Sequence, residues 1–269
     1  MAETGPRRSS LLQKSEFDSP ETRAQLAAAG LDSLDGLHDV RGEAFNQRAD
    51  RVVWTCLLPE TASGTERRIY IKLNRGRRRL WPRMTDLKTG QVGQTLTTRE
   101  WNGIGVLAGL GLAVPRRLAL LEEGLLHFRS AVVMDAVPPA DSVDMLLQNG
   151  GWWQLSPADR NQILEGMIGT VVRISAAGFG WRGTGSRHFY PERQPDGQWK
   201  HWLIDCEGVH RSTSPAVLRR DLDKLARSMV ESGADQPALD RLTTLIDSAL
   251  AGAVLPGSRR AATLLRRAA

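Results

Sequence analysis

The sequence predicts an α+β fold in which a β-rich part of the chain precedes a helical part. Between positions 51 and 137, short segments rich in branched and aromatic residues are separated by turn-forming residues, a pattern typical of β-strands. After position 141, apolar residues recur at helical spacing instead. A chain of 269 residues, 41% of them apolar, can bury the core of two closely packed lobes. We therefore expect a β-rich N-lobe followed by a helical C-lobe.

These patterns divide the chain into four regions. A short helix is expected to begin at Ser19-Pro20-Glu21, because serine favours the N-cap and proline the first helical position. The eighteen residues before it are polar and lack a sustained period, so we expect a loose arm there. The predicted regions are an N-terminal arm with a short helix (1–41), the N-lobe (42–137), the C-lobe (138–257) and a basic C-terminal tail (258–269).

Two pairs of β segments are expected in the N-lobe. The segments 52–58 (VVWTCLL) and 68–73 (RIYIKL) flank turn-forming residues, which predicts an antiparallel hairpin. The second pair, 116–121 and 125–137, is separated by Glu-Glu-Gly. The N-lobe should therefore be mainly β-sheet.

Helices are predicted from apolar spacing and from their end signals. The segment 95–112 has apolar residues at helical spacing after a threonine cap, and it should end at Gly109 or Gly111. A longer helix should begin at Ser156-Pro157 and be closed by Gly178. The C-lobe should therefore be built around this long helix and the helical segments near the C-terminus.

Composition narrows the classes of protein to consider. The chain has no run of about eighteen apolar residues and no apolar segment at its start, so neither a membrane span nor a secretory signal is expected. Cys56 and Cys206 lie far apart and lack metal-ligand spacing. We expect a cytoplasmic protein. Its net charge of +6 favours polyanionic partners, with basic residues concentrated at 67–79 and 258–269.

Three residue positions suggest phosphate chemistry. Lys72 lies in a β segment between apolar neighbours, where an ammonium could reach the phosphates of a nucleotide; a lysine on an edge strand is the alternative. Glu100 lies near the start of the following helix, where it could pair with Lys72 or simply complement the helix dipole. Asp205 ends the β segment HWLID, where it could hold Mg²⁺ or begin a turn.

Their order along the chain, together with several motifs between about Gly42 and Met229, resembles the Kdo/WaaP lipopolysaccharide kinase family. The resemblance implies a two-lobed protein-kinase-like fold, with Lys72, Glu100 and Asp205 as the catalytic residues. The motifs are Thr98-Arg99-Glu100-Trp101, Leu110-Gly111 with Val114-Pro115, Leu203-Ile204-Asp205 with Gly208 and His210-Arg211, and Arg220-Asp221-Leu222 with Leu225.

The segment 179–190 (FGWRGTGSRHFY), here called the glycine-rich loop, departs from the family pattern. Alignment of its end on His188-Phe189 places Gly183 where the family has its catalytic aspartate. That aspartate orients or accepts the proton of the attacking hydroxyl. Glu207 and Asp196 are candidate replacement bases. Arg182, Arg187 and the glycine amides of the loop suit phosphate groups.

The resemblance implies ATP and Mg²⁺ as cofactors. Lys72 would hold the α and β phosphates, with Glu100 as its partner, and Asp205 would hold Mg²⁺. His188 would lie near the metal or the phosphates; since Mg²⁺ prefers oxygen ligands, a hydrogen bond to Asp205 or to a phosphate fits histidine better than ligation. Only Gly42 and the segment EAFNQRADRV could cover the phosphates.

Backbone groups of Met134, Asp135 and Ala136 would line the adenine site in a hinge, although the same segment is also compatible with an ordinary buried strand.

Three functional hypotheses follow. The first is an ATP-dependent kinase that phosphorylates a sugar hydroxyl of the lipopolysaccharide core or a related glycolipid at the inner membrane, where the tail 258–269 would contact anionic lipid or simply fray. The second is a pseudokinase or nucleotide-binding scaffold, favoured by Gly183. The third, nucleic-acid binding, has only charge in its favour, so we do not expect nucleic acid as a partner.

Overall fold

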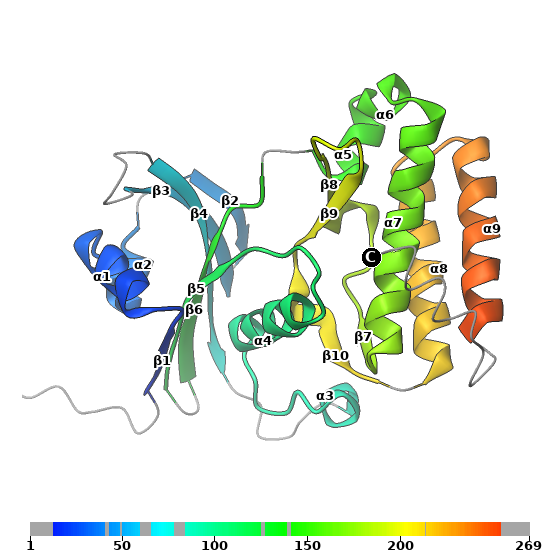
Figure 1. The fold of residues 1–269 in the computed structure, drawn as a ribbon. Coiled ribbons are helices and arrows are strands. Elements are labelled where there is room, and N and C mark those ends of the chain that lie inside the picture. The colour runs from blue at the N-terminus through cyan, green and yellow to red at the C-terminus, as the bar shows by residue number, and fades with distance from the viewer. Residues whose placement is uncertain are drawn as a thin grey trace, which may run out of the picture. The chain divides into compact units, whose positions relative to one another are not determined.

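The computed structural model describes most of the chain and confirms the α+β class (Figure 1). The predicted basic tail (258–269), Gly42 and most of the turn after residue 59 lie outside the described residues. The described ranges are 13–40, 43–48, 50–59, 66–77, 84–124, 127–138, 141–212 and 214–253. They fall into two compact units, the first within 1–83, 93–98 and 116–136 and the second within 84–92, 99–115 and 137–269.

The first unit contains a six-stranded antiparallel sheet with the order β1-β5-β6-β4-β3-β2 (Figure 1). The predicted hairpin is confirmed, since β3 pairs with β4 from Arg51↔Asn74 to Pro59↔Glu66. The strands are β1 (Gln13–Phe17), β2 (Glu43–Arg48), β3 (Arg51–Pro59), β4 (Glu66–Arg77), β5 (Arg117–Glu123) and β6 (His127–Asp135).

Two edge strands were not predicted. Residues 13–17, expected to be part of a loose arm, form β1 by pairing with β5. The segment proposed to cover phosphates contains β2, which pairs with β3. Both strands are short and polar, so pairing with an existing sheet edge, rather than local propensity, decides their conformation.

Helices α1 (Pro20–Ala28) and α2 (Leu34–His38) pack on one face of this sheet. The Ser19 hydroxyl accepts a hydrogen bond from the Thr22 amide at 3.1 Å, which confirms the predicted N-cap. Burial of apolar side chains from both layers supplies the main stabilisation of this unit. The core includes Leu26, Leu34, Leu37, Leu58, Ile69, Ile71, Leu73, Leu118, Leu121, Ala131 and Val133.

Lys72 lies on the opposite face of the sheet. Ile71 and Leu73 point into the core, and side chains alternate along a strand, so Lys72 points away from it. Its register neighbour on β6 is Val132. Since β4 lies between β6 and β3, the alternative of a lysine on an edge strand is wrong.

Helix α4 (Leu96–Gly109) is tied to this second face at its N-terminus. The Thr95 hydroxyl accepts from the Thr98 amide at 3.1 Å, which provides the predicted threonine cap. The Thr98 hydroxyl donates to the Glu122 carboxylate at 2.6 Å, and the Thr97 hydroxyl donates to the Ser130 hydroxyl at 2.7 Å. These buried bonds fix where the helix starts.

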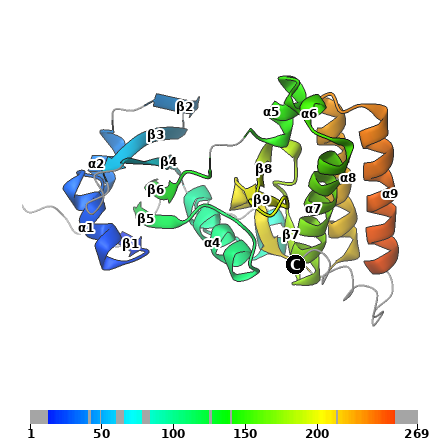
Figure 2. The ribbon, with the colours of Figure 1, turned by 45° about the horizontal axis from the view of Figure 1, so that its top comes forward.

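The second unit is mainly helical, and α7, α8 and α9 lie side by side in it (Figures 1 and 2). The Ser156 hydroxyl accepts from the Asp159 amide, and Gly178 adopts φ 82° after α7, so both predicted ends of that helix are confirmed. Apart from α4, the helices described in this unit are α3 (Met84–Thr89), α5 (Val143–Gln148), α6 (Gly151–Gln154), α7 (Pro157–Ala176), α8 (Pro215–Glu231) and α9 (Gln236–Ala253). Among the residues described, no helix combines the length and the apolar character needed to cross a bilayer.

Two two-stranded antiparallel sheets and two 3₁₀ turns complete the second unit. Strand β7 pairs with β10, and β8 pairs with β9. The glycine-rich loop thus contains β7, η1 and the start of β8. Of the predicted segment HWLID only residues 201–203 belong to β9, so the strand ends two residues before Asp205, which caps η2. The elements are β7 (Phe179–Trp181), η1 (Ser186–His188), β8 (Phe189–Arg193), β9 (Trp199–Leu203), η2 (Cys206–Gly208) and β10 (Val209–Arg211).

His201 on β9 makes the stability of this unit depend on pH. Its Nε2–H donates to the Ile163 carbonyl at 3.1 Å, and burial lowers the pKa of the imidazole to about 4. Because this pKa lies below that of the unfolded chain, the unfolded state takes up the proton first as the pH falls. The contribution of neutral His201 to the free energy of unfolding is therefore complete above about pH 6.5 and is lost as the pH falls toward 4.

We expect His201→Gln to flatten the loss of stability between pH 6.5 and pH 4, because the amide does not titrate. One proton taken up by the unfolded state alone corresponds to a slope of up to about 1.4 kcal/mol per pH unit. Urea denaturation at a series of pH values measures the slope. Identical profiles for the two proteins would contradict the assignment.

Candidate active site

Asp205 has an unusual backbone conformation. Its φ of 59° is the only positive φ at a non-glycine residue among those the structure describes. This left-handed region is costly for L-residues, although aspartate tolerates it better than most. The indole Nε1–H of Trp181 donates to the Asp205 carbonyl at 3.2 Å. The conformation is thus supported by a specific tertiary contact.

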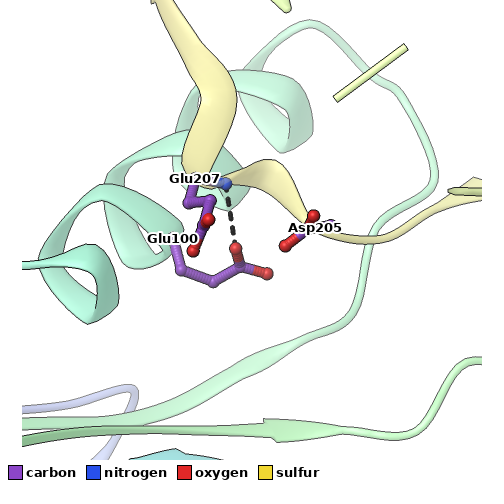
Figure 3. A group of neighbouring side chains, drawn as sticks. All are labelled: Glu100, Asp205 and Glu207. Carbon is purple, nitrogen blue, oxygen red and sulfur yellow. Dashed lines mark hydrogen bonds between the residues drawn. The ribbon is translucent and has the colours of Figure 1, made fainter. Parts of the chain in front are cut away.

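The turn that follows Asp205 packs against helix α4 (Figure 3). The Glu100 carboxylate is 1% exposed and accepts a hydrogen bond from the Glu207 amide at 2.9 Å. One helical turn later on the same face, a Cβ at Gly103 would lie 2.0 Å from the Cys206 carbonyl oxygen. Glycine at position 103 therefore permits the 205–207 turn to approach α4 closely. The bond to Glu100 fixes where along the helix the turn lies.

Three carboxylates meet at this turn. Oxygens of Glu100, Asp205 and Glu207, here called the carboxylate cluster, lie within 4.8 Å of one another. Figure 3 shows the three side chains facing one another from α4 and the 205–207 turn. Carboxylate oxygens are the ligands that Mg²⁺ prefers, and a divalent cation would offset their mutual repulsion. The donor set fits the metal that the sequence predicted for Asp205.

His188 lies beside Asp205. Its Nδ1 makes a short contact with the Gly183 carbonyl, so Nδ1 carries the proton. Its Nε2 is 3.5 Å from Asp205 Oδ2. Burial lowers the pKa of His188, while Asp205 and the Gly183 carbonyl oppose that shift. The structure brings His188 and Asp205 together; the role of His188 remains a prediction.

The space that a side chain at position 183 would need is already occupied. A Cβ at Gly183 would lie 2.4 Å from Trp181 Nε1 and 2.9 Å from the Asp205 carbonyl oxygen. Any side chain at position 183 would therefore displace the bond between Trp181 and Asp205. The sequence identified Gly183, but it did not indicate that Trp181 occupies the space beside it.

The two candidate replacement bases lie in different places. Glu207 belongs to the carboxylate cluster. Asp196 lies in the turn between Arg193 and Trp199, at the tip of the β8–β9 hairpin. The opposite end of the hairpin, where Phe189 pairs with Leu203, is the end nearer to Asp205 along the chain. Asp196 is exposed and accepts a hydrogen bond from the Gln198 amide. Of the two, only Glu207 is close to Asp205.

The predicted hinge residues belong to the sheet of the first unit. Met134 and Asp135 end β6, and Ala136 follows. The amides of Asp135 and Ala136 donate to the carbonyls of Arg116 and Arg68, each at 3.0 Å. Contacts with a purine would have to use other backbone groups of this segment. The pairing of Lys72 with Glu100 and the adenine contacts remain predictions.

Gly103 and Trp181 were missed in the sequence. The available signal for Gly103 was a glycine inside a helical pattern, which lowers helix propensity and indicates a packing reason when it is retained. Trp181 had no comparable signal, because its contact with Asp205 joins positions 24 residues apart.

Comparisons with known proteins bear on the family and the fold of this chain. The chain matches the model of the lipopolysaccharide kinase (Kdo/WaaP) family over residues 40–244. Its structure is similar to that of WaaP in complex with acyl carrier protein, with a TM-score of 0.63 at 17% identity, over 95% of this chain and 98% of that chain. No curated protein matches the sequence. The structural likeness confirms the predicted two-lobed kinase-like fold.

We expect Gly103→Ala to destabilise the second unit by about 1–3 kcal/mol, because its Cβ would collide with the Cys206 carbonyl. Gly109 in the same helix has nothing within 4 Å of the position that a Cβ would take, so it serves as the matched control. Gly109→Ala should be neutral or stabilise by up to about 1 kcal/mol. Urea denaturation of both variants measures the difference; equal effects would show that α4 does not hold the turn by close approach.

Proposed function

The chain belongs to the lipopolysaccharide kinase (Kdo/WaaP) family, and from this premise we propose that it is an ATP-dependent phosphotransferase. Its acceptor is a sugar hydroxyl of the lipopolysaccharide core or of a related glycolipid, met at the cytoplasmic face of the inner membrane. The observation that carries the proposal is the carboxylate cluster built around Asp205 on the turn held by α4.

The metal-binding role falls to Asp205 and its neighbours. Asp205 would offer oxygen ligands to Mg²⁺. His188 would complete the ligand set through its unprotonated Nε2, or would hydrogen-bond Asp205 when its imidazole carries a proton on both nitrogens. When bound, Mg²⁺ neutralises charge on the transferred phosphoryl group. The bond from the Glu207 amide to Glu100 would hold the turn that carries Asp205 in place for the metal.

ATP binding is assigned to Lys72 and the hinge. Lys72 extends from an inner strand, on the face to which the first turn of α4 is tied through Glu122 and Ser130. We assign it to the α and β phosphates, with Glu100, further along α4, as its partner. Met134, Asp135 and Ala136 are assigned to the adenine.

Proton transfer is the step for which this chain lacks the family residue. Phosphoryl transfer has a loose transition state and depends mainly on positioning and electrostatic stabilisation. We assign the hydroxyl proton of the acceptor to Glu207, the nearer of the two candidate bases.

The alternative is a pseudokinase that binds nucleotide without transferring phosphate. One observation favours it: the space beside Gly183 is taken by Trp181, so no carboxylate can project from this position.

We expect calorimetry to detect binding of ATP that depends on Mg²⁺, and Asp205→Asn to weaken it by about tenfold or more, because one charged ligand is lost. Asp196→Asn, an exposed position on the hairpin tip, is the control and should bind as the native protein does. Absence of binding under every condition would exclude both the kinase and the nucleotide-binding alternative.

We expect labelled γ-phosphate of ATP to appear on purified lipopolysaccharide. Glu207→Gln should reduce the rate by about 10²-fold or more if Glu207 is the base, while Asp196→Asn should leave the rate unchanged. Nucleotide binding without transfer to lipopolysaccharide or to glycolipid would support the pseudokinase instead.

A further inference from the structure

Hydroxyl groups join the glycine-rich loop to the end of α8. The Ser186 hydroxyl lies 2.8 Å from the Ser228 hydroxyl and 2.9 Å from the Ser232 hydroxyl. The Ser186 amide also donates to the Ser228 hydroxyl at 3.0 Å. Ser186 is fully buried, and Ser232, which follows the last residue of α8, is 6% exposed. The 3₁₀ turn η1, which begins at Ser186, is therefore bonded to the last turns of α8.

This series of hydroxyls ends on a carboxylate. The Ser232 hydroxyl donates to Asp144, on α5, in a short hydrogen bond. The Ser228 carbonyl, at 2.7 Å, is its alternative acceptor, but a charged acceptor forms the stronger bond. Because Ser232 spends its single proton on Asp144, it accepts from Ser186, and Ser186 in turn accepts from Ser228. The directed series Ser228–Ser186–Ser232–Asp144 is here called the serine chain.

The members of the serine chain depend on one another. Hydrogen bonds linked in series polarise each other, so the loss of one member weakens the bonds that remain. At an exposed serine, water would replace a lost partner, but Ser186 has no exposed surface, and its hydroxyl would stay unsatisfied. The placement of η1 in the second unit therefore depends on Ser232, 46 positions later in the sequence, and on the carboxylate of Asp144.

His188 is the last residue of η1. Its amide donates to the Gly185 carbonyl at 2.9 Å, which closes the turn, and its Nδ1 contacts the Gly183 carbonyl. Its own carbonyl accepts from the Ile204 amide at 3.2 Å, and its Nε2 lies 3.5 Å from the Asp205 carboxylate. The backbone that the serine chain holds therefore also sets where the imidazole lies relative to Asp205.

We propose that Ser186, Ser232 and Asp144 are positioning residues for His188. They hold η1 so that the imidazole keeps its proton on Nδ1 and presents a bare Nε2 to the surroundings of Asp205. A bare Nε2 can ligate a metal or take up a proton, whereas Nε2–H can do neither. The effect on the imidazole needs no kinase activity, but its consequence for Mg²⁺ and ATP rests on the proposed function.

The tautomer of His188 tests the proposal. Nitrogen NMR of the imidazole at about pH 8, where histidine is neutral, distinguishes Nδ1–H from Nε2–H, and His188→Asn identifies its signals. We expect the native protein to show the Nδ1–H form alone. Ser232→Ala should add a second population with the proton on Nε2, because a displaced η1 loosens the contact with the Gly183 carbonyl. Binding of ATP with Mg²⁺ should weaken by about threefold to tenfold in this variant.

Ser248→Ala is the matched control. The hydroxyls of Ser232 and Ser248 each bond the carbonyl four residues earlier, that of Ser228 and that of Thr244 respectively. Of the two, Ser232 alone belongs to the serine chain. Ser248→Ala should therefore leave both the tautomer and the affinity for ATP unchanged. Ser232→Thr keeps the hydroxyl and should give the native spectrum.

Asp144→Asn is the milder variant of the serine chain, because the amide oxygen can still accept from Ser232 without the charge. It should produce a smaller second population than Ser232→Ala does, and the thermal midpoint of each variant checks that the protein is folded. The double variant should lower the midpoint by less than the sum of the two single losses, because both changes break the same series of bonds.

The proposal is overturned if Ser232→Ala and Asp144→Asn lower the thermal midpoint yet leave the tautomer of His188 unchanged, because the serine chain would then serve stability alone. Equal changes in Ser232→Ala and Ser248→Ala would overturn it as well. Calorimetry with ATP and Mg²⁺ on the same samples separates the two proposals. A second tautomer in a protein that does not bind ATP would retain the positioning role and reject the kinase. ATP binding with an unchanged tautomer in Ser232→Ala would do the reverse.

Discussion

The left-handed backbone of Asp205 is the constraint on which the candidate active site depends. A non-glycine residue in this region costs on the order of 1–3 kcal/mol and persists only where its surroundings support it. Here the Trp181 indole binds its carbonyl, and Glu100 binds the amide of Glu207 two residues later. The same contacts that stabilise the backbone also aim the Asp205 carboxylate toward Glu100 and Glu207.

Gly183 and Trp181 are two consequences of one packing arrangement. The indole lies where a side chain at position 183 would have to begin, so the bond to Asp205 and an aspartate at 183 exclude each other in this backbone. The contact that holds the Asp205 turn therefore leaves no room for a carboxylate at position 183. In the proposed phosphoryl transfer, which would rely mainly on positioning and charge, this arrangement would favour positioning over a base at position 183.

The glycine-rich loop is bonded both to the 205–207 turn and to α8. Asp205, Glu100 and Glu207 lie on its side toward the 205–207 turn, while Lys224 and Arg220 come from α8. Buried Asp221 holds the loop by accepting from the Trp181 amide and also neutralises Arg220. The loop thereby links the turn that carries Asp205 to α8.

The sequence by itself determined the α+β class, the β3–β4 hairpin and the ends of α4 and α7, because these depend on local propensity, capping and short motifs. Tertiary structure alone decided β1, the inner position of Lys72 in the sheet, and the close approach of Cys206 to Gly103. It also brought Arg182 to Lys224 across 42 positions. Such features arise from contacts between distant segments, whose partners leave no periodic pattern in either segment.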